Sequence, residues 1–81
     1  MQVKLRAFAA IRDSLGFGEK HVELPDGARV EALLQHLHTL HPAAGLPERH
    51  FSIAVNRSFV PRDHVLNDGD EVALIPPVSG G

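Results

Sequence analysis

A single amphipathic helix, predicted over residues 30–41, constrains the fold more than any other feature of this sequence. Pro42 predicts the end of the helix at His41, because proline disfavours helical backbone at the residue before it. With 81 residues the chain makes one small domain, so this helix has to cover one face of the sheet that the remaining segments form. The apolar residues at helical spacing form one stripe, comprising Val30, Leu33, Leu34, Leu37 and Leu40.

The start of this helix lacks a good capping side chain. Arg29, the residue before the helix, is a poor N-cap, whereas Glu31 places a favourable negative charge in the first turn. We therefore expect either a loose start or capping by Asp26.

Segments on both sides of the helix alternate between apolar and polar residues, as strands with one buried face do. In residues 2–8, Val3, Leu5 and Ala7 face inward, and Phe8 falls on the outer face, which is unusual for a large ring. A helical turn closed by Gly16 is predicted directly after this strand. Further strands are predicted over 21–24, 51–55, 59–60 and 71–75, with a loop over 43–50 and an irregular segment over 61–66.

The predicted order of elements is strand, strand, helix, strand, short strand, strand. The first two strands are expected to pair as a hairpin. If the first and last strands lie side by side at the centre of the sheet, they run parallel and the helical segment supplies the crossover. This is an α+β fold of the β-grasp, or ubiquitin-like, type. We expect the domain to span residues 1–75 and an extended tail to follow over 76–81.

Composition excludes several classes of function. The formal net charge of −2 gives no electrostatic support for nucleic-acid binding, and no basic patch is interleaved with aromatic residues. The chain has no cysteine, hence no thiolate nucleophile or thiolate metal ligand. No run approaches the ~18–20 apolar residues of a membrane span, and the first residues lack the apolar core of a signal peptide. A soluble, cytoplasmic protein is therefore the expectation.

Nor does the chain carry a recognisable catalytic or metal site. The serines lie outside any nucleophile-elbow motif, and the carboxylates Asp68, Asp70 and Glu71 are clustered on a turn, where we expect them to be solvated. His38 and His41 could share a helix face, but no third ligand is spaced to complete a site. We expect exposed histidines, no bound metal and no catalysis by this chain on its own.

The last six residues form a distinctive tail, Pro76-Pro77-Val78-Ser79-Gly80-Gly81. The prolines restrict the backbone to extended conformations and stop the preceding apolar run from continuing as a central strand. The two glycines have no Cβ and wide conformational freedom. A stiff base with a slim tip suits entry into a narrow cleft, although a frayed terminus is the default for a chain end.

A group of outward apolar side chains is expected at the root of this tail. On the last strand Val72 and Leu74 take the core side, so Ile75 takes the other side. The parallel arrangement makes Phe8 a neighbour of Ile75, and Phe59 can join them. Such a cluster suggests a surface that binds a partner protein. The alternative is that one of the rings tucks under the 43–50 loop.

These residues resemble a known family, the molybdopterin synthase small subunits (the MoaD type), which are ubiquitin-like sulfur carriers. The likeness covers essentially the whole chain, and the tail is its most discriminating part. The segment Asp68-Gly69-Asp70-Glu71-Val72 is shared with other ubiquitin-like sulfur carriers. The other matching segments are 8–13 (FAAIRD), 24–27 (LPDG), 54–56 (AVN) and 66–73 (LNDGDEVA).

The resemblance implies that the terminal carboxylate of Gly81 is the reactive group. A ubiquitin-activating-type enzyme would use ATP to adenylate it, and sulfur transfer would then give a thiocarboxylate. The tip that carries the thiocarboxylate would enter the large subunit of molybdopterin synthase and donate sulfur to cyclic pyranopterin monophosphate. An α-carboxyl group is an anion at neutral pH and a poor electrophile, so activation from outside is required.

By the same resemblance, Phe8, Phe59 and Ile75 would be the apolar contacts to both partners. Arg12, Asp68, Asp70 and Glu71 would form the polar rim, and the tail would line the partner's channel. The synthase would be a heterotetramer, and this chain would bind no cofactor itself.

Three other interpretations stay open at the level of sequence. One is a sulfur carrier for thiamin or cysteine synthesis, of which Pro76-Pro77 argues against the thiamin version. Another is a ubiquitin-like protein modifier whose Gly81 is joined to lysines. An interaction module with an inert tail is a further class.

Overall fold

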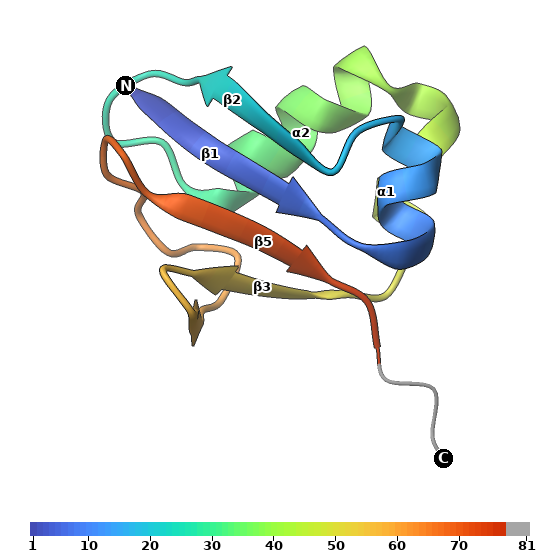
Figure 1. Ribbon diagram of the computed structural model, residues 1–81. Coiled ribbons are helices and arrows are strands. Elements are labelled where there is room, and N and C mark those ends of the chain that lie inside the picture. Colours follow the sequence, from blue (N-terminus) through green and yellow to red (C-terminus); the bar gives the residue numbers. More distant parts are fainter. Residues whose placement is uncertain (78–81) are drawn as a thin grey trace.

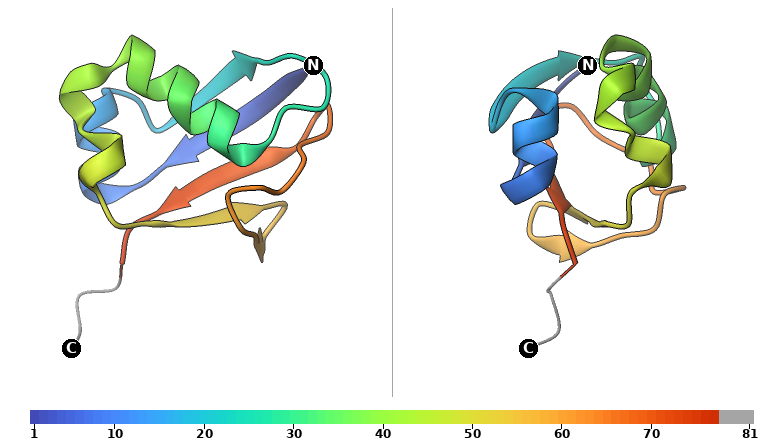
Figure 2. Two further views of the ribbon diagram at one scale, coloured as in Figure 1. Left: turned by 180° about the vertical axis from the view of Figure 1, so that it is seen from behind. Right: turned by 90° about the vertical axis from the view of Figure 1, so that its right-hand side faces the viewer.

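The computed structural model of the chain describes residues 1–77. These residues form a mixed five-stranded sheet with the long helix α2 lying across one face (Figure 1; Figure 2). The elements are β1 (Gln2–Ala7), α1 (Ala9–Leu15), β2 (Glu19–Glu23), α2 (Val30–Leu40), the 3₁₀ helices η1 (Pro42–Ala44) and η2 (Leu46–Glu48), β3 (Ser52–Val55), β4 (Ser58–Phe59) and β5 (Glu71–Ile75).

The strand order β2-β1-β5-β3-β4 confirms the β-grasp prediction. The first and last strands, β1 and β5, are parallel neighbours at the centre, with Leu5 opposite Val72 and Ala7 opposite Leu74. β2 pairs antiparallel with β1, as expected for the first two strands. Because β1 and β5 run the same way, the C-terminal end of β5 lies beside the C-terminal end of β1 (Figure 1).

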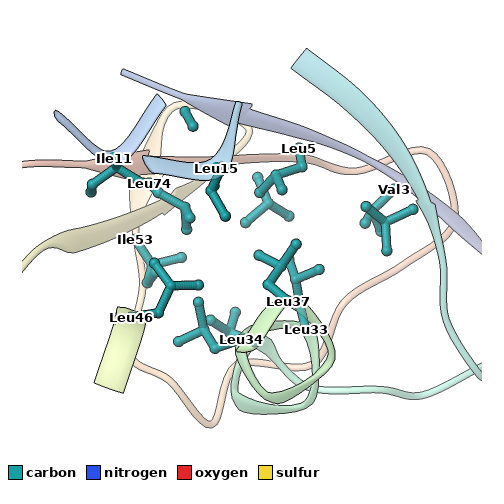
Figure 3. Close-up of a cluster of buried hydrophobic side chains, with 14 of the residues drawn as sticks. Val3, Leu5, Ile11, Leu15, Leu33, Leu34, Leu37, Leu46, Ile53 and Leu74 are labelled. Atoms are coloured by element: carbon teal, nitrogen blue, oxygen red, sulfur yellow. The ribbon is translucent and has the colours of Figure 1, made fainter. Parts of the chain in front are cut away.

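The core forms between the inner face of the sheet and α2. Inward residues of β1 and β5 alternate with outward ones, as the period-two pattern predicts, and Leu5, Val72 and Leu74 are fully buried. Figure 3 shows Leu33, Leu34 and Leu37 of α2 pointing toward the strands, with Ile11 and Leu15 of α1 filling one end. The predicted helix stripe is wrong only at Leu40, which is 56% exposed because β2 is the edge strand and no further strand covers it.

The N-terminus of α2 is held by backbone rather than by a side chain. The N–H groups of Val30 and Glu31 donate to the carbonyl oxygens of His64 and Arg62, at 3.0 and 2.9 Å. Arg29 is the N-cap and makes no side-chain cap. Capping by Asp26 is therefore wrong, since that carboxylate instead pairs with the Met1 amino group at 3.1 Å. The start is not loose either, because the irregular 61–66 segment satisfies the first amides.

Candidate partner-binding site

The outer face of the sheet, opposite α2, carries a shallow hollow of about 300 Å³. We call its lining the outer-face patch. It brings together the three apolar residues expected there, Phe8, Phe59 and Ile75. Phe59 is 72% exposed and Phe8 37%, so neither ring tucks under the 43–50 segment. The complete lining is Arg6, Phe8, Ala54, Arg57, Phe59, Glu71, Ala73 and Ile75.

One row of cross-strand neighbours builds the floor of the patch. Ala73 of β5 lies opposite Arg6 of β1 on one side and opposite Ala54 of β3 on the other. Ala54 in turn lies opposite Phe59 of β4. Directly opposed residues place their side chains on the same face of a sheet. Two alanines in the middle and larger side chains on both sides therefore produce a hollow. Its position is set by the alternation of inward and outward side chains along β1, β5, β3 and β4.

Charged groups border this apolar floor on the β1 side. The guanidinium of Arg6 lies 3.1 Å from the carboxylate of Glu71, and it lies 5.4 Å from the centre of the Phe8 ring. Arg6 thus orients both an acid and an aromatic ring of the patch. The side chains of Arg6 and Glu71 keep 42% and 36% of their surface exposed, so a partner can reach both.

Backbone strain flanks the two exposed rings. Among residues 1–77, the non-glycine residues with positive φ are Ala9 at 51°, Asn56 at 51° and Arg57 at 72°. Ala9 follows Phe8 directly and turns the chain from β1 into α1. Asn56 and Arg57 form the turn between β3 and β4, where positive φ at both central positions matches the twist of a hairpin. Such backbone conformations persist where the surrounding structure enforces them. The outward position of Phe59 itself follows from its place opposite Ala54.

A partly buried polar network holds that turn against β5. The Asn56 amide donates to the Asp70 carboxylate at 2.9 Å, and the Asn56 side-chain oxygen accepts from the Glu71 N–H at 3.0 Å. Asp70 also accepts from the Asn67 N–H at 2.8 Å and is only 9% exposed. The expectation of a solvated Asp70 is therefore wrong, because its oxygens are occupied within the fold. Asp70 is held within the fold directly before β5, and it does not line the outer-face patch.

Two of the expected rim residues lie elsewhere. Asp68 accepts a hydrogen bond from the Gln2 N–H at 2.8 Å, at the start of β1, whereas Phe8 follows the end of that strand. Arg12 on α1 lines a separate hollow with Phe17 and Gly18. Glu71 alone of the predicted rim is part of the patch. Arg57 is a patch residue that sequence reasoning missed, although it lies in a turn that was predicted.

The tail begins at the edge of the patch. β5 ends at Ile75, and Pro76 and Pro77 follow it with half-buried and exposed side chains. The expected tail residues Val78, Ser79, Gly80 and Gly81 lie outside the described residues. The apolar patch and the start of the tail are therefore contiguous along the chain.

The histidines in α2 and directly after it differ from the prediction of exposed positions. His36 is exposed, but His38 and His41 are half-buried. His41 packs edge-on against Phe17, with ring centres 5.6 Å apart. Within residues 1–77, no three histidine or acidic side chains gather closely enough to hold a metal ion. The helices in that range are all too short or too polar to cross a membrane.

Comparisons with known proteins agree with the geometry. The model of the ThiS family matches residues 5–81. A curated protein of Chlamydomonas reinhardtii named molybdopterin synthase sulfur carrier subunit is 45% identical over the whole of both chains. A protein of the same name from Escherichia coli is 41% identical over 98% of this chain and 99% of its own.

Solved structures show the same fold. The small archaeal modifier protein 1 of Haloferax volcanii superposes with a TM-score of 0.85 at 25% identity, covering 95% of this chain and 98% of the other. A chain from a Helicobacter pylori complex of subunits 1 and 2 of molybdopterin-converting factor is 29% identical, with a TM-score of 0.64 and all of both chains covered.

Proposed function

Because this chain belongs to the ThiS family and matches molybdopterin synthase sulfur carrier subunits along its whole length, we propose that it is the sulfur carrier subunit of a molybdopterin synthase. The observation that carries this proposal is the 45% identity over the full length of both chains, with a family match that runs through Gly81. The outer-face patch beside the start of the tail supplies the physical support.

The proposed reactive group is the main-chain carboxylate of Gly81. An ATP-dependent activating enzyme joins it to AMP with release of pyrophosphate, which turns a poor electrophile into a good one. A sulfur nucleophile then displaces AMP and leaves a thiocarboxylate. The thiocarboxylate donates its sulfur to cyclic pyranopterin monophosphate, and the carboxylate returns on hydrolysis. Gly80 and Gly81 leave the carbonyl carbon open to approach from either face, because they have no side chains.

The proposed partners bind the outer-face patch in turn. One is the large synthase subunit, which supplies the catalytic residues and forms a heterotetramer with this chain. The Helicobacter pylori complex of subunits 1 and 2 supports binding to a large subunit. The other is the activating enzyme. Phe8, Phe59 and Ile75 provide the apolar contact, and Pro76 and Pro77 follow directly after the strand that ends at Ile75. Since both partners use one surface, they bind in exclusive steps.

Intact-mass spectrometry tests the proposal. Protein incubated with the activating enzyme, ATP and a sulfur donor should gain the mass difference of sulfur for oxygen, and then lose it when the large subunit and substrate are added. Deletion of Gly81 should abolish the gain, while the circular dichroism spectrum and melting temperature stay unchanged. A Val65→Asp variant, altered at an exposed residue outside the patch, is the matched control and should form the thiocarboxylate normally. A sulfur mass gain that persists without Gly81 would contradict the proposal.

Protein modification is a second candidate, favoured by the likeness to the archaeal modifier protein. In that case Gly81 becomes joined to lysine side chains of other proteins. Cell lysates probed for this chain should then show bands of higher mass that resist reduction and depend on Gly81. A single band of unconjugated protein, together with the sulfur mass gain, would reject this candidate.

A further inference from the structure

A further hollow lies at the opposite edge of the sheet from β4, between the edge strand β2 and helix α2. Its volume is about 150 Å³, which is too small for a drug-sized ligand and suited to a single side chain. Its apolar lining is Val22, Leu37 and Leu40. Leu40 is 56% exposed and so is one of the large apolar side chains that the fold leaves uncovered. This hollow lies on the helix side of the sheet, whereas the outer-face patch lies on the other side.

The backbone along the hollow is available for pairing. Met1 and Leu24 exchange two hydrogen bonds, of 2.8 and 2.9 Å, and the Ala7 N–H donates to Gly18 at 3.0 Å. Hydrogen-bonded pairs recur at every second residue of an antiparallel ladder. The register therefore turns the N–H and C=O groups of Glu19, His21 and Glu23 away from β1. In the described residues no strand occupies that edge of β2.

A positive charge without an acidic partner stands at one end of the hollow. Lys20 lies opposite Leu5, so its side chain is on the helix side, where its ammonium group is 5.2 Å from the centre of the Phe17 ring. In residues 1–77, no carboxylate lies within ion-pair distance of Lys20, whereas Lys4 is paired with Glu19 at 3.0 Å. His36 and His41 also line the hollow. The acidic Glu23 also belongs to the lining, but it lies opposite Gln2, so its side chain is on the outer face of the sheet, where it accepts a hydrogen bond from the Gln2 amide at 3.5 Å. The groove thus combines an apolar floor with the cationic Lys20 on its helix side.

We propose that this groove binds an extended segment of a partner protein, which adds a strand to β2. The segment carries a large apolar side chain and a carboxylate two residues apart. Residues i and i+2 of a strand share a face, and so do Lys20 and Val22 on β2. The apolar side chain fills the hollow against Leu37 and Leu40, while the carboxylate pairs with Lys20. Main-chain bonds to His21 supply affinity, and the two side chains supply selectivity.

A second copy of the chain fits this edge less well. Symmetric antiparallel pairing about His21 would set Glu19 opposite Glu23 twice, and like charges in direct opposition destabilise a strand pair. An inward lysine on an edge strand also opposes pairing with any apolar strand that lacks an acid. The groove therefore favours an acidic partner strand over self-association.

Nuclear magnetic resonance with the full ¹⁵N-labelled chain tests the proposal. The probe is the peptide acetyl-Ser-Glu-Val-Leu-Val-Ser-amide, in which Glu and Leu are two residues apart. Peptide binding with a Kd of about 1 mM or tighter is expected. The amide shifts should change over Glu19–Glu23 and over the last turn of α2. The same peptide with an N-methylated central valine, which cannot complete the strand ladder, should bind at least tenfold more weakly.

Matched variants separate the groove from the outer-face patch. Lys20→Glu should weaken peptide binding about tenfold, because it places an acid against the probe's carboxylate. Leu40→Asp should do likewise, and Phe59→Asp should bind the peptide as the unaltered chain does. The Lys20→Glu variant should still form the thiocarboxylate. A failure of the proposed sulfur-carrier function can therefore be distinguished from a failure of the proposed peptide-binding groove.

Three outcomes of the peptide titrations would overturn the proposal: no amide shift change at several millimolar peptide, changes centred on Phe8 and Phe59, or equal binding by Lys20→Glu. Concentration-dependent broadening of the β2 amides without peptide would also overturn it, in favour of self-association.

Discussion

The guanidinium of Arg6 and the carboxylate of Glu71 meet at 3.1 Å across the two parallel strands at the centre of the sheet. Both side chains are more than one-third exposed, so water screens the pair. A double-mutant cycle with Arg6→Ala and Glu71→Ala should give a coupling energy of about 1 kcal/mol or less in urea unfolding. A larger coupling energy would show that the pair contributes substantially to the stability of the fold, and not chiefly to the surface that a partner contacts.

Phe59→Asp should separate binding from folding. The ring is 72% exposed on the short edge strand β4, so its loss should change unfolding free energy by less than about 1 kcal/mol. A buried aromatic anchor of an interface is commonly worth about 2 kcal/mol or more, so affinity for the large subunit should fall at least about 30-fold. Calorimetric titration measures the affinity. Leu40→Asp is the control and should bind the large subunit normally; a large drop in melting temperature for Phe59→Asp would place that ring in the core.

Asp70→Ala should destabilise the fold far more than Asp68→Ala. Asp70 is nearly buried and accepts hydrogen bonds from Asn56 and Asn67, both of which lose their partner in the variant. We expect a loss of about 1.5–3 kcal/mol in urea unfolding. Asp68 is exposed and accepts one bond from Gln2, so its removal should cost under about 1 kcal/mol. Equal effects of the two substitutions would contradict the assigned network.

Two leucines of α2 make a matched pair for burial. Leu37 is 1% exposed, and Leu40, three residues later on the same helix, is 56% exposed. Leu37→Ala should lower the unfolding free energy by about 2–5 kcal/mol, since it removes buried methyl groups and leaves a cavity. Leu40→Ala should change it by less than about 1 kcal/mol. Comparable losses would mean that the hollow beside β2 is closed in solution.

Glu19 should show the effect of Lys4 on protonation. The hydrogen bond and charge of Lys4 hold the pKa of the Glu19 carboxyl below its ordinary value. Since the folded pKa is below the unfolded one, this pair stabilises the fold above the unfolded pKa and its contribution is lost as pH falls through the folded pKa. Lys4→Met should raise the Glu19 pKa in a carbon-detected titration and flatten the acid limb of the stability curve. Lys20→Met, altered on the opposite face of β2, should leave the Glu19 pKa unchanged. An equal rise of that pKa in both variants would refute the assignment of its shift to Lys4.

Periodicity was sufficient to predict most of the architecture. Inward Val3, Leu5 and Ala7 on β1, and Val72 and Leu74 on β5, follow from alternation because a strand with one buried face has no other consistent register. The outward position of Ile75 follows from the same rule. With one helix and a short chain, a sheet covered on one face was the arrangement that could bury these residues together.

The same reasoning failed where a residue's surroundings depend on distant segments. Asp70 was expected in solvent because it lies in a turn sequence, yet Asn56, fourteen positions earlier, folds over it. Leu40 fits the helical stripe, but whether a strand lies beneath it depends on where the sheet ends. Arg57 enters the patch because the β3–β4 turn brings it there with positive φ.

The sequence by itself determined the succession of strands along the chain, the side on which their residues face, the single covering helix and the composition of the tail, because these depend on local periodicity and backbone chemistry. Only the tertiary structure decided which outward residues share a surface, which carboxylate is buried and which edge of the sheet stays open. Those properties arise from strand order and chain packing, which join residues such as Arg6 and Glu71 that are far apart along the chain.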